Sequence, residues 1–208
     1  MMNNADAVTV TLDDRAPTTR CRILATAERL FREIGYQKTT VADIAKSLRM
    51  SPANVYRFFD SKKAINEAVV ARVIRDIEAL IVTIADAPGR SGTDRVAEII
   101  HSLHDDCAER CRANPRMHEM VESAMTESWD VCGQHVARIG AVLVRVVREG
   151  MASGEFGVPD AEIAALCIQA AIVRYCNPVL VSLYPNVPGP PIEDMIAFVL
   201  RSLQASTA

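Results

Sequence analysis

The side chains best suited to recognition chemistry lie together in one segment, SPANVYR, at residues 51–57. Asn pairs well with adenine and Arg with guanine, and Ala or Pro can contact the methyl group of thymine. A short helix carrying such groups can enter the DNA major groove, which is about 12 Å wide. We therefore interpret Pro52, Ala53, Asn54 and Arg57 as candidate base contacts. The alternatives are that Asn54 is merely exposed, and that Arg57 is solvated or contacts a phosphate.

A second group, His104, Cys107 and Cys111, carries the soft nitrogen and sulfur ligands that suit Zn or Cu. At about 100° per residue, the three lie within about 60° on a helical wheel. One helix rarely supplies a whole site, and no fourth ligand is identifiable. We therefore expect no bound metal, and a metal or redox sensor is the alternative. The six cysteines form no CxxC pair and are interpreted mainly as small buried hydrophobes.

An apolar repeat after Thr40 predicts a short helix over residues 40–48. Asp43 follows Thr40 by three residues, which resembles a capping box. Arg49 and Met50 then form a tight turn. These features predict the first helix and the turn of a two-helix unit.

The second helix of this unit is predicted to begin at Ser51 and to end near Phe58. Ser is a good N-cap, and the Pro that follows suits the first helical position. Val55, Phe58 and Phe59 are expected to face inward. This arrangement leaves the candidate base contacts on the outer side of the helix.

Longer helices are predicted on both sides of the two-helix unit. Apolar residues from Ile23 to Ile34 recur with helical period, so we expect a helix over 18–34 that ends at Gly35. Ser61 is expected to cap a helix over 62–85.

Charge is distributed unevenly along the chain. Residues 20–63 contain ten Lys or Arg and four Asp or Glu, although the whole chain has a formal net charge of −3. A basic segment on an acidic body is typical of a polyanion-binding head joined to a domain that does not bind DNA. The alternative is chance clustering on solvated faces, and the helical pattern of the same segment favours the first interpretation.

This stretch resembles the DNA-binding domain of the tetracycline-repressor (TetR) family of bacterial regulators. The resemblance is ungapped over residues 27–64. The matching residues are Ala27, Leu30, Phe31, Gly35, Tyr36, Thr39, Thr40, Val41, Asp43, Ile44, Ala45, Ser51, Val55, Tyr56, Phe59, Ser61, Lys62 and Ala64. It implies a flexible arm (1–17), a helix-turn-helix head (18–63) and a ligand-binding and dimerisation domain (64–208). The implied function is a transcriptional repressor that a small-molecule effector releases from a pseudo-palindromic DNA operator.

The resemblance also implies which residues hold the DNA backbone. Thr40, Tyr56 and Lys62 are expected to contact phosphates, and Lys38 is a further candidate. The family usually has Gly in the turn where this chain has Arg49. A left-handed Arg there would cost about 1 kcal/mol, which a phosphate contact would offset. Tyr56 has the alternative role of a core aromatic residue with its hydroxyl at the rim.

The rest of the chain is predicted to be helical too, giving an all-α fold of about nine helices. Segments 161–176 and 195–203 are apolar on more than one face and must be buried all round. By resemblance they form a four-helix homodimer interface, and the alternative is an intramolecular core. The expected interface residues are Leu166, Ala170, Val173, Ile196, Val199 and Leu203.

An effector pocket is expected among the middle helices, again by resemblance. Its candidate lining residues are Met117, Met120, Met125, Trp129, His135, Arg174 and Tyr175. For each of them the alternative is ordinary core filling. Arg174 lies within an apolar helix and must be paired, exposed or directed at a ligand, and an acidic effector would suit it.

Other classes of protein are disfavoured. The chain contains no GxSxG, HExxH or Walker-type phosphate loop, so we expect neither an enzyme nor a cofactor. Its longest apolar runs contain Arg, Glu or Pro, so no membrane span is expected. Acidic residues replace the basic start of a signal peptide, which predicts a cytoplasmic protein. A DNA-binding adaptor that docks another protein is a further alternative.

Overall fold

The computed structural model describes residues 18–127, 129–183 and 187–204, and the side chain of Trp129 lies outside the described part. The predicted arm at 1–17 also lies outside it. Within these ranges the fold is all-α, as predicted, and comprises ten helices. They are α1 Thr19–Ile34, α2 Val41–Ser47, α3 Pro52–Tyr56, α4 Lys62–Ala85, α5 Gly92–Ala113, α6 Pro115–Glu127, α7 Trp129–Ala152, α8 Ala161–Cys176, α9 Pro178–Leu183 and α10 Ile192–Leu203.

The described ranges hold one helix more than the sequence predicts, because the chain bends after α8. Asn177 is extended, with φ −91° and ψ 114°. Its Oδ1 accepts the N–H of Leu180 at 3.1 Å and so caps the next helix. Pro178 has no N–H to lose and suits the first position of that helix. The segment after 177 is therefore a separate helix, α9.

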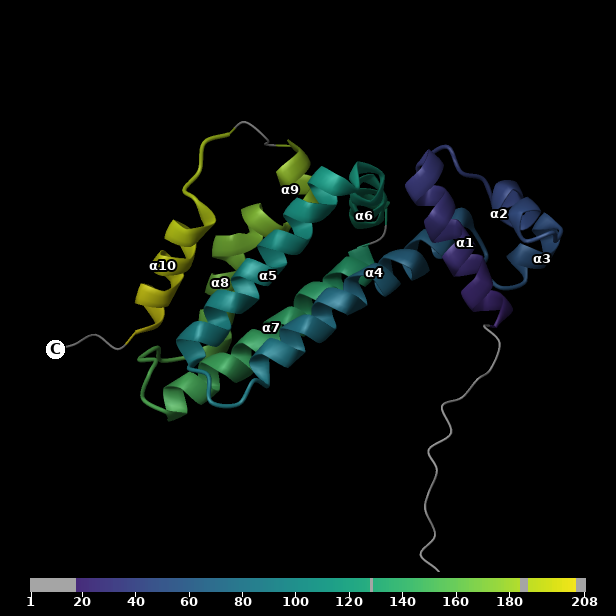
Figure 1. Cartoon of the computed structure of the whole chain (residues 1–208). Coiled ribbons are helices and arrows are strands. Elements are labelled where there is room, and N and C mark those ends of the chain that lie inside the picture. The colour runs from purple at the N-terminus through teal and green to yellow at the C-terminus, as the bar shows by residue number, and fades with distance from the viewer. Residues whose placement is uncertain (1–17, 128, 184–186, 205–208) are drawn as a thin grey trace, which may run out of the picture.

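Figure 1 shows the arrangement of the helices. Helices α1–α3 form a head at one end of the molecule. Helix α4 runs out of the head into the body, where it lies alongside α7 and packs on α5. Helix α10 covers α5 and α8 on the side of the body away from the head. In the described ranges, no helix is both long enough and apolar enough to span a bilayer.

The first helix supplies much of the core of the head. Ile23, Ala27 and Phe31 of α1 are completely buried on one stripe. Gly35 ends the helix at φ 94°, a conformation that favours Gly. Ile34 was predicted to lie on the same stripe but is 41% exposed, and it is the last residue of α1.

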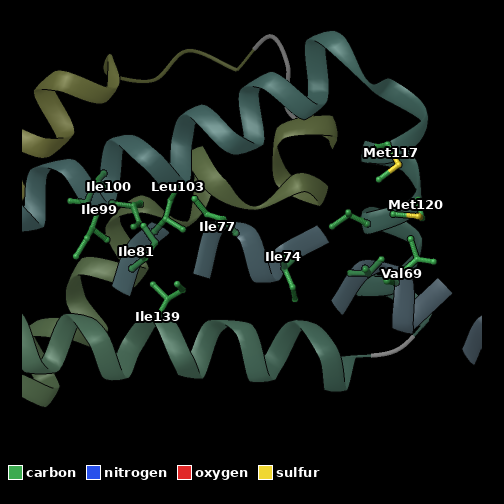
Figure 2. Packing of buried hydrophobic residues seen from close by; sticks show 14 of the residues in the cluster. Val69, Ile74, Ile77, Ile81, Ile99, Ile100, Leu103, Met117, Met120 and Ile139 are labelled. Atoms are coloured by element: carbon green, nitrogen blue, oxygen red, sulfur yellow. The ribbon is translucent and has the colours of Figure 1, made fainter. Parts of the chain in front are cut away.

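The core of the body is built from isoleucines and leucines on α4, α5 and α7. Figure 2 shows Ile77 and Ile81 of α4 between Ile99 and Leu103 of α5 and Ile139 of α7. Each of these side chains is at most 7% exposed. Complete burial of such a side chain contributes about 1.5–3 kcal/mol to folding. This three-helix layer holds the body together.

Glu155, in the connection between α7 and α8, fixes the start of α5. Its Oε2 accepts the N–H of Gly92 and its Oε1 accepts the N–H of Thr93, both at 2.7 Å. Burial acts to raise the pKa of this carboxyl group, but these hydrogen bonds and Arg95 outweigh it and the pKa is lowered. Glu155 therefore bonds as a carboxylate to the positive end of α5.

Candidate nucleic-acid interface

Helix α3 turns one side to the core of the head and the other to solvent. Val55 is completely buried and Phe59, just beyond the helix, is 5% exposed. Ser51 Oγ accepts the N–H of Asn54 at 3.3 Å and caps the helix. Phe58 was expected to face inward but is 41% exposed, because it follows the end of α3. Two buried anchors thus fix the orientation of this short helix.

The predicted base contacts lie on the outer side of the unit. Pro52, Ala53 and Arg57 are exposed, and Asn54 is half-buried. Tyr56 is 49% exposed, which does not fit the alternative of a core aromatic residue. The structure therefore brings the candidate base contacts and Tyr56 to one accessible helix.

Helix α2 starts with the capping box that the sequence predicts. Thr40 Oγ1 accepts the N–H of Asp43 at 3.1 Å, and Asp43 Oδ2 accepts the N–H of Thr40 at 2.9 Å. The Thr40 hydroxyl also donates to Asp43 Oδ2 at 2.6 Å, and these bonds lower the pKa of Asp43. Thr40 is exposed, so the reinforced helix start is accessible to a phosphate.

The turn between α2 and α3 contains the strain expected from the sequence. Arg49 has φ 55° and is the sole residue other than Gly with positive φ in the described ranges. A non-Gly residue in this conformation costs about 1 kcal/mol. The backbone holds the turn through the N–H of Met50, which donates to the Ala45 carbonyl at 3.0 Å. The exposed guanidinium lies beside the candidate interface.

Lys62, a predicted phosphate contact, also bonds within the head. Its Nζ donates to the carbonyl oxygens of Tyr36 at 2.9 Å and Gln37 at 3.3 Å, and it lies 4.3 Å from the centre of the Tyr36 ring. Two of its three N–H groups are thus committed within the head. Lys62 primarily braces the start of α4 against the loop after α1, and one N–H is left for a phosphate.

Some cations of the head are paired with acids and others are not, and the exposed Arg20 and Arg22 of α1 are among those without an acidic partner in the described ranges. On α1, Arg29 pairs with Glu33 at 2.8 Å and Arg32 with Glu28 at 2.9 Å. Around α2, the turn and α3, the cations have no acidic partner within 4.0 Å among the described residues. These are Lys38, Lys46, Arg49 and Arg57. Unneutralised positive charge therefore gathers where the candidate base contacts are exposed, which suits a polyanion.

Helix α6 ties the head to the body. The Tyr36 hydroxyl donates to Glu127 Oε2 at 3.2 Å, and burial followed by the Glu127 charge raises the pKa of Tyr36 to about 12. Arg116 donates to the Arg32 carbonyl at 3.3 Å, at the end of α1. Asn66 of α4 donates to the Met120 carbonyl at 3.3 Å. A shift of α6 would therefore reach the head through several polar contacts.

A cavity of about 130 Å³ lies in the body and is lined by α4 to α9. Val121 and Met125 of α6 form part of its wall, so the helix that contacts the head also borders the cavity. Ile139 and Ile172 contribute to the apolar lining. Arg110 is its charged lining residue and was missed by the sequence analysis. The available signal was its spacing of three residues from Cys107, on the buried stripe of α5.

The predicted pocket residues divide between the cavity and other places. Met125 and His135 line the cavity, and the His135 Nδ1 lies 2.9 Å from Glu78 Oε1. Met117 and Met120 instead fill the core below the head, beside Val69, as Figure 2 shows. The side chain of Trp129 lies outside the described residues.

Arg174 and Tyr175 bond to the connection before α10, which for Arg174 fits the alternative of a paired side chain. Arg174 Nη1 donates to the Pro188 carbonyl at 3.2 Å. The Tyr175 hydroxyl donates to the Pro190 carbonyl at 2.8 Å. Neither residue lines the cavity, and Arg174 is satisfied by backbone carbonyls.

The His and Cys group on α5 does not assemble as a metal site. No three His, Cys, Asp or Glu side chains in the described ranges are arranged to hold an ion. His104 Nδ1 lies 3.3 Å from the Tyr175 carbonyl, and Cys107 is completely buried. Burial raises the pKa of Cys107 to about 11 and that of Cys176 to about 12. Such thiols stay protonated near neutral pH and react slowly, which disfavours Cys107 as a redox sensor.

The predicted interface residues fall into two sets. Leu166 is 60% and Val173 is 40% exposed on α8, and Ala170 on the same helix is also exposed. On α10, Ile196, Val199 and Leu203 are buried within the chain, as the alternative of an intramolecular core requires. The second set therefore has no surface to offer a partner, and the exposed apolar residue of α10 is Phe198, at 60%.

Two family profiles match the chain. One, described as "Bacterial regulatory proteins, tetR family", matches residues 23–69, and the other, "Tetracyclin repressor-like, C-terminal domain", matches residues 92–187. The transcriptional regulator UidR of Escherichia coli strain K12 is 27% identical over 140 residues, which are 67% of this chain and 56% of UidR. The chain thus spans little more than half the length of this relative. The biofilm-operon negative regulator IcaR of Staphylococcus aureus strain Newman is 49% identical over 49 residues, 24% of this chain and 26% of IcaR.

Solved structures share the fold over most of the chain. A TetR/AcrR-family regulator of Thermobifida fusca has a TM-score of 0.61 at 22% identity and covers 91% of this chain and 98% of its own. Reduced NemR of E. coli has a TM-score of 0.67 at 13% identity, with the same coverage of 91% and 98%. At these identities the likeness shows the fold alone. The two profiles together cover more than half of the chain, which therefore belongs to the TetR family of bacterial regulatory proteins.

Proposed function

We propose that this protein is a DNA-binding transcriptional repressor, with a head of residues 18–63 and a body of residues 64–208. The observation that carries the proposal is the orientation of α3, which buries Val55 and exposes Ala53 and Arg57 beside unneutralised cations. The name of IcaR, a negative transcriptional regulator that is 49% identical to this chain over 49 residues, supports repression.

The contacts with DNA divide into reading and positioning. Pro52, Ala53, Asn54 and Arg57 read base edges in the major groove. Thr40, Tyr56, Lys38 and Arg49 hold phosphates around them, which suits their exposure. Lys62 contributes mainly by bracing the head, through its bonds to the carbonyls of Tyr36 and Gln37.

The working unit is a homodimer that reads a two-fold-symmetric operator. Exposed apolar side chains on α8 and α10, Ile163, Leu166, Val173 and Phe198, support a dimer face, since they are 40–60% exposed in the single chain. A pair of heads would bind half-sites about 34–36 Å apart, in successive major grooves.

A small-molecule effector in the body cavity releases the DNA. The cavity and the contacts of α6 support this route, because Met125 borders the cavity and Tyr36 and Arg116 connect α6 with α1. The effector must bind the form with unsuitably spaced heads more tightly, since only differential affinity shifts the equilibrium. The cavity favours a ligand sensor over an adaptor with a filled core.

An unbiased selection of duplex DNA with the full chain tests the proposal. We expect enrichment of a two-fold-symmetric sequence whose binding weakens steeply with salt. Arg57→Ala should weaken binding to that sequence by about 1–3 kcal/mol and relax the preference at one base pair in each half-site. Arg29→Ala is the matched control, since Arg29 is paired with Glu33 on α1. Selection of no symmetric duplex would overturn the proposal.

A further inference from the structure

We propose that the body cavity binds a small molecule with an anionic head, a carboxylate, and an apolar tail, and that Arg110 recognises the head. This inference rests on the proposed effector site and adds the chemical class of its ligand. It is carried by an arginine at the wall of an apolar cavity, whose buried Nε–H lacks a partner among the described residues.

Arg110 is buried without full compensation. Its side chain is 14% exposed, and Nη1 forms an ion pair with Asp106 one turn earlier on α5. Nη1 thus has Asp106 as its partner, whereas Nε has no hydrogen-bond partner among the described residues. A guanidinium has five N–H groups, so Asp106 leaves most of its donor capacity unused.

Among the described residues no Asp or Glu lines the cavity, so the lining offers a cation no carboxylate. Gln169 Nε2 donates to the Val136 carbonyl at 2.8 Å, and His135 faces Glu78. Asn177 accepts the Leu180 N–H through Oδ1, so its remaining polar group is an NH₂ donor. The donors of Arg110 and Asn177 therefore complement an acceptor.

The remaining lining is apolar and sets the size of the tail. Ile74, Leu103, Val121 and Ile172 are among its residues. The cavity, about 130 Å³, is similar in size to an engineered apolar cavity of roughly 150 Å³ that binds benzene. A tail of about six carbons is thus the expected length. Charge-assisted bonds to a buried guanidinium would hold the carboxylate at one end.

The test compares three probes of equal tail length, hexanoate, 1-hexanol and hexylamine, by calorimetry at pH 7 with the full chain and no DNA. Hexanoate should bind at least tenfold more tightly than 1-hexanol, and hexylamine most weakly, because bonds to a charged group add about 1.5–3 kcal/mol. Arg110→Gln should remove the preference for hexanoate and leave 1-hexanol binding within about twofold of the parent value. Arg112→Gln is the matched control, since Arg112 is 76% exposed on the same helix, and it should keep the preference.

Three results would overturn the inference. They are equal binding of hexanoate and 1-hexanol, a preference that survives Arg110→Gln, and no binding of any probe. Should Arg110→Gln fail to fold, Arg110→Lys keeps the charge without the planar donor edge and should reduce the preference without abolishing it. Because these measurements use no DNA, their failure leaves the proposed repressor function to its own test with selected duplexes.

Discussion

The head and the body are both helical, but they use their polar groups in opposite ways. In the head, Lys62, Ser51 and Thr40 bond to the backbone or to a neighbouring cap, and unpaired cations are exposed. In the body, Arg110 keeps an Nε–H without a partner among the described residues, beside a cavity. A surface that must fit DNA gains from being held rigid in advance, whereas a sensor needs a group that another molecule completes.

The largest expected difference concerns core packing. Ile44 of the head is completely buried, whereas Ile139 of the body is 4% exposed and borders the cavity. Ile44→Ala should cost about 3–5 kcal/mol of unfolding free energy, and Ile139→Ala about 2 kcal/mol, because one side of Ile139 already lacks close neighbours. Urea denaturation of both variants measures this. Equal losses would mean that the body is packed as tightly around Ile139 as the head is around Ile44.

The next effect compares a helix cap of the body, at Glu155, with a helix cap of the head, at Asp43. Glu155→Gln should lower the free energy of unfolding by about 1–2 kcal/mol. The carboxylate accepts one N–H with each oxygen, from Gly92 and Thr93, whereas the amide has only one acceptor oxygen. Asp43→Asn in the head should cost less, since solvent screens that exposed carboxylate.

The cost of Glu155→Gln should depend on pH in a defined direction. The pKa of Glu155 is lowered in the folded state, so its contribution is complete above the unfolded value of about 4.3. It is lost as the pH falls through the lowered folded value. Denaturation at pH 7 and at pH 3 should therefore show the gap between parent and variant shrinking. A constant gap would assign the loss to packing instead of charge.

A smaller effect is expected at the strained turn of the head. Arg49→Gly relieves a non-Gly residue at φ 55° and should stabilise the fold by about 1 kcal/mol. If Arg49 holds a phosphate, the same change should weaken binding to all DNA sequences alike. The slope of log binding constant against log salt concentration should then correspond to about one released counterion fewer. Thermal denaturation measures the effect on stability, and DNA binding at several salt concentrations measures the effect on the phosphate contact. Stabilisation without any change in the salt dependence would remove Arg49 from the interface.

The head was more predictable than the body, because its signals are local. The capping box at Thr40 and Asp43, the cap at Ser51 and the left-handed turn at Arg49 each depend on residues within one turn of the chain. Burial of Val55 follows from helical period alone.

In the body, the sequence predicted helices but misplaced side chains. Arg174 stood out as a charge in an apolar helix, yet carbonyls of the connection before α10 satisfy it. Arg110 looked ordinary at the charged end of α5, yet it borders the cavity. Val199 was expected at an interface but faces its own chain. These outcomes depend on which segments meet in the folded chain, and no pattern within one helix encodes that.

The smallest effect concerns the junction of the two regions, where Tyr36 bonds to Glu127 across 91 residues of sequence. Tyr36→Phe should cost about 0.5–1 kcal/mol, because Glu127 is exposed and water replaces the lost bond. In a double-mutant cycle with Glu127→Gln, the pair should show a coupling of similar size. Glu127→Gln should also lower the pKa of Tyr36 from about 12, since the Glu127 charge helps to raise it. The contrary result would be additive losses of unfolding free energy in the two variants, together with an unchanged pKa of Tyr36. It would mean that α6 makes no polar contact with the head at this point, and that α4 and apolar contacts join the head to the body.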